Sequence, residues 1–150
     1  LIGHNFPRTI LRLASTRDEL EVVNDQFGVP TSADLVAGVT AKIIDQYFIE
    51  KCTANGDSEK FSGIYHLAPS GSASWYDFAL ELVRQTQLQN PGLKLAKNLL
   101  PVPSAGYPST AKRPKYSVLK TEKLVRAFSF SLPEWQFDVA RFVREWSALK

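Results

Sequence analysis

Cysteine and methionine are almost missing from this 150-residue chain: Cys52 is the single cysteine, and there is no methionine. One cysteine excludes a disulfide within the chain, so we expect a reducing compartment and a cytoplasmic protein. Because a translated chain begins with Met and this one begins with Leu1, we also expect a piece of a longer protein. No apolar run approaches the roughly 20 residues of a membrane span, and no signal peptide is recognisable, so no membrane partner is expected.

Motifs for cofactors and catalysis are also scarce. The sequence has no Gly-x-Gly-x-x-Gly, the fingerprint that binds dinucleotides, and no Gly-x-Ser-x-Gly elbow of a serine hydrolase. We do not expect Tyr47 with Lys51, or Tyr116 with Lys120, to be the Tyr/Lys pair of a dehydrogenase. His4 and His66 are isolated, which leaves no credible metal cluster. The chain alone is therefore expected to carry no catalytic residues.

The net charge of +3 is too small to indicate a nucleic-acid-binding protein, but basic residues cluster late in the chain. Such a cluster suits an anionic ligand such as a diphosphate, although a solvated surface has the same composition. It lacks the interleaved aromatic residues of a nucleic-acid-binding face, so no nucleic acid is expected as a partner. The cluster comprises Lys112, Arg113, Lys115, Lys120, Lys123 and Arg126.

The spacing of apolar residues predicts alternating helices and short strands, hence an α/β or α+β fold. Trp75 and Phe78 are expected in the core, and the Pro/Ser/Gly-rich stretch 104–114 is expected to be a loop. Capping boxes are predicted at Thr31/Asp34, Ser74/Asp77 and Ser131/Glu134. Helices are predicted over 6–14, 31–52, 74–85, 121–128 and from 131 onward, and strands over 20–23, 64–67 and within 93–100.

The segment from Val22 to Thr31 is the most informative. It reads as a strand that ends in a polar turn and leads into a helix, and open α/β sheets bind ligands at such strand ends. Asp25 and Gln26 could contact a ligand or simply form the turn, and Thr31 could contact a ligand or cap the helix. Phe27 could stack on a base or belong to the core.

Two further residues are candidate ligands of a phosphate. Arg113 precedes Pro114, which stiffens the backbone, and its guanidinium fork matches two phosphate oxygens; a structural arginine is the alternative. Asn5 precedes Pro7 at a predicted helix start, where a side chain can cap the helix, contact an anion, or do both.

These segments resemble those of dTDP-4-dehydrorhamnose reductases, which are extended short-chain dehydrogenases. The runs Asn-Asp-Gln-Phe-Gly-Val-Pro-Thr (24–31) and Tyr-Pro-x-x-Ala-Lys-Arg-Pro-x-x-Ser-x-Leu (107–119) carry the resemblance. It implies a C-terminal substrate-binding part without the Rossmann cofactor half. Residues 1–52 would be the tail of that half, and 53–150 the small substrate domain. The implied substrate-binding residues are Asn5, Asp25, Gln26, Phe27, Thr31 and Arg113.

The resemblance also implies a reaction for the parent protein. Hydride from NADPH (or NADH) would reduce dTDP-4-dehydro-L-rhamnose to dTDP-L-rhamnose, with the catalytic Tyr and Lys outside this chain. By itself the chain would bind a dTDP-sugar and need no cofactor. Magnesium and a homodimer of the full-length protein are further expectations. The alternative is a non-catalytic sugar-nucleotide-binding or regulatory module, like the regulatory subunit of methionine adenosyltransferase, which has the same fold.

Overall fold

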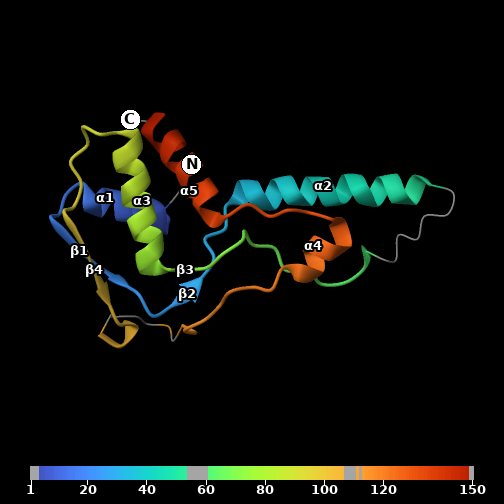
Figure 1. Cartoon of the computed structure of the whole chain (residues 1–150), viewed down its shortest axis with the longest axis horizontal. Coiled ribbons are helices and arrows are strands. Elements are labelled where there is room, and N and C mark those ends of the chain that lie inside the picture. Colours follow the sequence, from blue (N-terminus) through green and yellow to red (C-terminus); the bar gives the residue numbers. More distant parts are fainter. Residues whose placement is uncertain (1–3, 54–60, 107–110, 112, 149–150) are drawn as a thin grey trace.

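A computed structural model of the chain describes residues 4–53, 61–106, 111 and 113–148. Helices alternate with short strands, which confirms the predicted mixed α/β class (Figure 1). In chain order the elements are α1 (Phe6–Ala14), β1 (Glu19–Val23), β2 (Phe27–Gly28), α2 (Ala33–Cys52), β3 (Ala73–Ser74), α3 (Trp75–Gln89), β4 (Asn98–Val102), η2 (Ser104–Gly106), α4 (Glu122–Phe128) and α5 (Trp135–Ala148).

The larger core lies at the end of the molecule where α1, α3 and α5 gather beside two strands (Figure 1). Strands β1 and β4 are parallel, with Glu19 opposite Asn98 and Val23 opposite Val102. Helix α5 contributes Trp135, Val139 and Val143, which are all buried. The other buried members are Ile10, Leu11, Ala14, Leu20, Val22, Ala73, Ala79, Leu82, Val83, Leu95 and Ala96.

A second, smaller core joins α2 to α4. Val39 is the buried residue of α2, and it packs in a cluster with Leu124, Phe128 and Leu132. The ring of Phe128 stacks on Phe61 at 5.0 Å between centroids. Helix α2 extends away from α1 and α3, and α4 lies alongside it (Figure 1). In the part of the chain that the structure describes, no helix is both long and apolar enough to span a bilayer.

Two of the three predicted capping boxes are wrong. Helix α2 begins at Ala33, and its cap is Ser32, whose hydroxyl accepts a hydrogen bond from the Leu35 amide at 3.0 Å. The Thr31 hydroxyl instead donates to the Val29 carbonyl at 3.0 Å. Helix α5 begins at Trp135, so Ser131 lies too far upstream to cap it. The Ser74/Asp77 box at α3 is confirmed.

The strand predictions are partly correct. Strand 20–23 is confirmed as part of β1, which begins one residue earlier, and the strand expected within 93–100 is displaced to 98–102. No strand forms over 64–67: Ile64 is 82% exposed, and this segment packs through Tyr65 and Leu67. The short pair β2–β3 was not predicted. The proposed division at residue 52 stays a prediction.

Candidate functional site

Three residues from distant parts of the sequence lie between two hollows of the surface. Gln26 follows β1, Trp75 begins α3, and Arg113 follows η2, and all three line both hollows. The large hollow has a volume of about 900 Å³ and the small hollow about 270 Å³. Pockets for small molecules typically measure about 300–1,000 Å³. We call the two hollows together the Gln26–Arg113 depression.

The large hollow lies over the apolar side of α1 and β1. Phe6, Thr9, Ile10 and Leu13 reach it from α1 because they repeat at helical spacing, so they share one face. All residues of β1 line it as well, together with Arg17, Leu100 and Ser104, so the lining mixes apolar side chains with charged ones such as Glu19 and Glu21. Apolar contacts with a few placed polar groups can hold a ligand and fix its orientation.

The small hollow is formed where β2 meets β3 and the start of α3. Phe27 is 38% exposed, and Trp75 and Phe78 line the same hollow. The Trp75 ring packs on Phe6 at 4.7 Å between centroids, so one aromatic group serves both core and hollow. Gly28 permits close approach here, because a Cβ at this position would lie 3.2 Å from the Ser117 hydroxyl.

The predicted site residues divide into two sets. Gln26, Phe27 and Arg113 line the depression together. Asn5 lies outside the residues that line either hollow and caps α1, where its side chain accepts a hydrogen bond from the Arg8 amide at 3.0 Å. Asp25 and Thr31 are outside both linings as well. The Asp25 carboxylate contacts Ser104, and Thr31 bonds within its own turn.

Trp75 is the lining residue that sequence reasoning missed. It was assigned to the core, and both Trp75 and Phe78 do pack against the core while remaining partly exposed. An available signal is the position of Trp75 in the first turn of a predicted helix, where free backbone N–H groups can meet an anionic ligand. What brings it to Phe27 is the pairing of β2 with β3, Phe27 opposite Ser74.

Comparison with known proteins assigns the family. The sequence profile described as "RmlD substrate binding domain" matches residues 2–148. The chain belongs to this family. A dTDP-4-dehydrorhamnose reductase of Escherichia coli K12 is 42% identical over 144 residues, which are 95% of this chain and 45% of that protein. The chain thus spans less than half the length of the relatives that it matches.

Solved reductase structures have the same fold. The dTDP-4-dehydrorhamnose reductase of Bacillus anthracis strain Ames, in complex with NADP, is 30% identical with a TM-score of 0.76, covering 97% of this chain and 44% of that one. The Clostridium acetobutylicum protein is 33% identical with a TM-score of 0.74, covering 97% and 45%. The resemblance to the C-terminal part of these reductases is therefore confirmed.

Two tyrosine–lysine pairs have the Tyr-x-x-x-Lys spacing of dehydrogenases, so spacing alone does not exclude them. Tyr47 and Lys51 lie late in α2, where the lysine Nζ is 5.9 Å from the tyrosine ring centroid, and neither lines the depression. Tyr116 is 67% exposed and lies outside any helix, in extended chain that rises about 3.3 Å per residue, so Lys120 is roughly 13 Å further along. These surroundings do not favour a catalytic pair in this RmlD domain.

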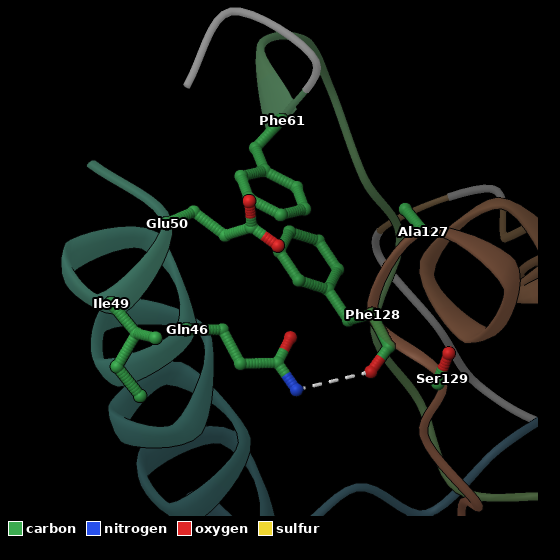
Figure 2. A pocket seen from close by; sticks show the side chains of 7 residues that line it. All are labelled: Gln46, Ile49, Glu50, Phe61, Ala127, Phe128 and Ser129. Atoms are coloured by element: carbon green, nitrogen blue, oxygen red, sulfur yellow. Dashed lines mark hydrogen bonds between the residues drawn. The ribbon is translucent and has the colours of Figure 1, made fainter. Parts of the chain in front are cut away.

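A third hollow, of about 570 Å³, lies between α2 and α4 (Figure 2). The Gln46 side chain points across it and donates a hydrogen bond to the Phe128 carbonyl at 3.3 Å. The Phe61 and Phe128 rings close one side as part of the smaller core. This hollow is lined by none of the predicted site residues, and its contacts connect α2 to α4.

Nowhere among the described residues do three His, Cys, Asp or Glu side chains gather closely enough to hold a metal ion. The dinucleotide fingerprint is likewise missing from the sequence. The lining residues Gln26, Phe27, Trp75 and Arg113 offer hydrogen-bonding, aromatic and cationic groups that suit recognition of a ligand.

Proposed function

We propose that this chain is the sugar-nucleotide-binding part of an NADPH-dependent reductase that converts dTDP-4-dehydro-L-rhamnose to dTDP-L-rhamnose. The observation that carries the proposal is that Gln26 and Arg113, from the two segments that resemble the reductases, line the same two hollows. The name of the relatives and the NADP in the Bacillus anthracis structure support the reaction and the cofactor.

Each lining residue has a chemistry that suits part of a nucleotide sugar. The Arg113 guanidinium would donate paired hydrogen bonds to the diphosphate. Phe27 and Trp75 offer aromatic faces for the base. The Gln26 amide can donate and accept, as hydroxyl groups of a sugar require. Asn5 and Thr31 are ligands only by resemblance, since each side chain already makes a local hydrogen bond.

In the parent enzyme this part would orient the substrate. NADPH supplies a hydride to the sugar ketone, and the groups that bind the cofactor would lie outside this chain. Binding energy from the diphosphate and base would hold the ketone in a reactive position, which accelerates a reaction without a chemical role for the binding residues. Homodimerisation, magnesium and the inactivity of the isolated chain also remain predictions.

Calorimetric titration of the 150-residue chain tests the proposal. We expect saturable 1:1 binding of dTDP-L-rhamnose, weaker binding of dTDP, and none of L-rhamnose, because diphosphate and base provide the main contacts. Equal responses to dTDP-L-rhamnose and L-rhamnose, in a chain shown by circular dichroism to be folded, would contradict the proposed ligand class.

A further inference from the structure

The chain that carries Arg113 is attached at its beginning to the residues that follow β1. The Asp25 carboxylate accepts two hydrogen bonds from Ser104, one from the backbone amide at 2.8 Å and one from the hydroxyl at 3.0 Å. Ser104 begins η2, directly after β4 and Pro103. The neighbouring Asn24 amide donates to the Val102 carbonyl at 3.0 Å, which extends the strand pairing to this point.

The same short segment also holds the chain just beyond Arg113. The Phe27 amide donates to the Lys115 carbonyl at 2.8 Å, and the Ser117 amide donates to the Phe27 carbonyl at 2.9 Å. The Ser117 hydroxyl donates to that carbonyl as well, at 3.0 Å. Figure 1 shows this later chain passing β2 on its way to α4.

Gln26 therefore lies between two attachment points. One is the Asp25 side chain, which holds Ser104, and the other is the Phe27 backbone, which holds Lys115 and Ser117. Arg113 is two residues before Lys115, so its position relative to Gln26 depends on both attachments. Phe27 makes its attachment through backbone atoms, which a substitution does not remove. The attachment to Ser104 is made by the Asp25 side chain, so a substitution can test it.

The negative charge of Asp25 strengthens hydrogen bonds to another residue of the protein. Both carboxylate oxygens accept hydrogen bonds from Ser104, and hydrogen bonds to an ionised acceptor are the stronger kind. The bond from the Ser104 amide holds the pKa of Asp25 below its usual value. Lys115 adds little, since its ammonium is 3.8 Å away and 81% exposed. Asp25 also lies outside the residues that line the depression.

We propose that Asp25 is a positioning residue, which holds Ser104 against the residues that follow β1 so that Arg113 faces the ligand, and that it does not bind the ligand itself. The proposal rests on the proposed function, because the ligand is the sugar nucleotide of that site. It gives Asp25 a role different from the substrate contact that the resemblance implies.

A double-mutant cycle on dTDP-L-rhamnose binding tests this role. In the otherwise unaltered chain, Asp25→Ala should weaken affinity about 10-fold, the scale of one charge-assisted hydrogen bond. In the Arg113→Ala background the same change should weaken affinity less than about twofold, because Asp25 acts through Arg113. Full additivity of the two changes would overturn the positioning role and indicate direct contact with the ligand.

Controls separate this role from general destabilisation. Asp45→Ala, at an exposed acidic residue of α2, should leave affinity unchanged. Asp25→Asn should restore much of the affinity, because the amide oxygen still accepts from the Ser104 backbone and its NH₂ can donate to the hydroxyl. If Asp25→Ala does not fold, Asp25→Ser replaces it in the cycle, because the shorter hydroxyl side chain keeps the turn preference and lacks the carboxylate. An Asn variant as weak as the Ala variant would contradict the proposal.

Amide hydrogen exchange without ligand separates this role from the proposed function. In Asp25→Ala, exchange of the Ser104 and Ser117 amides should accelerate at least about 10-fold, while amides in α3 keep their protection. Unchanged exchange at Ser104 would overturn the positioning role even if the nucleotide binds. Failure of the unaltered chain to bind dTDP-L-rhamnose would overturn the proposed function, and with it this role, even if exchange responds as expected.

Discussion

Arg113 is exposed and stands between the large and small hollows, with Pro114 beside it in the small one. Arg113→Ala should weaken dTDP-L-rhamnose binding about 10- to 100-fold, since hydrogen bonds to charged groups contribute about 1.5–3 kcal/mol. Arg113→Lys should weaken it less, because the charge remains and only the forked geometry is lost. Calorimetric titration of both variants measures the difference.

The matched control is Arg144→Ala, an exposed arginine of α5 outside both linings, which should leave affinity unchanged. Melting temperatures of all variants show whether folding is intact. Wild-type affinity in Arg113→Ala, together with normal melting, would make Arg113 an ordinary surface residue.

The lowered pKa of Asp25 leads us to expect that the stability of the fold depends on pH. Its folded pKa is lowered below the ordinary value of 3.8, first of all by the Ser104 backbone hydrogen bond. A lowered carboxyl pKa stabilises the fold above the unfolded pKa, and this stabilisation is lost as pH falls through the folded value. The melting difference between the unaltered chain and Asp25→Ala should therefore hold from pH 7 to 5 and shrink below about 3.8. A difference that disappears between pH 7 and 5, followed by circular dichroism, would refute this assignment.

At the scale of the elements, the start of α2 distinguishes two adjacent residues. Ser32 caps the helix and also donates to Asp138 of α5 at 2.6 Å, whereas Thr31 bonds only its own turn among the contacts described. Ser32→Ala should lower the free energy of unfolding by about 1–2 kcal/mol, and Thr31→Ala by less than about 0.5 kcal/mol. Urea unfolding of the two variants provides the measurement, and a larger loss in Thr31→Ala would show that the cap is misassigned.

The starts of α3 and α2 show which structural elements can be predicted from sequence. The Ser74/Asp77 box was found because all its hydrogen bonds are made within four residues. The cap of α2 was predicted at Thr31, one residue before the observed cap Ser32. Ser32 is also held by its hydrogen bond to Asp138, which lies 106 positions away in the sequence. Strand β2 was missed for a similar reason: its partners are β3 and the backbone at Lys115, which no local pattern reveals.

For the molecule as a whole, the two motifs that carry the resemblance imply one ligand for Gln26 and Arg113, and both residues line the depression. Asp25 was expected to bind the ligand with them, but its carboxylate accepts a hydrogen bond from the Ser104 amide. The parallel pairing of β1 with β4 brings this amide close to Asp25. Trp75 was missed because its spacing fits a core helix equally well. Composition and periodicity thus predict elements, and long-range pairing decides which side chains reach the depression.

The chain alone should have no reductase activity, since its sequence lacks a dinucleotide fingerprint and its two Tyr/Lys pairs lie in unsuitable surroundings. An assay of NADPH oxidation with dTDP-4-dehydro-L-rhamnose, followed by the loss of nicotinamide absorbance, measures this activity. Turnover above a control without protein would show that catalytic groups are present here after all.

An NMR titration can follow the Gln26–Arg113 depression directly while the ligand is added. The three tryptophans give separate indole signals in a ¹⁵N-correlated NMR spectrum, and Trp75→Phe assigns the one that matters. Trp75 lines both hollows, while Trp146 packs near the end of α5 outside both linings. Titration with dTDP-L-rhamnose should shift the Trp75 signal saturably and leave that of Trp146 in place. A Trp75 signal that does not move at saturating ligand, in the folded chain, would contradict the claim that this depression binds the sugar nucleotide.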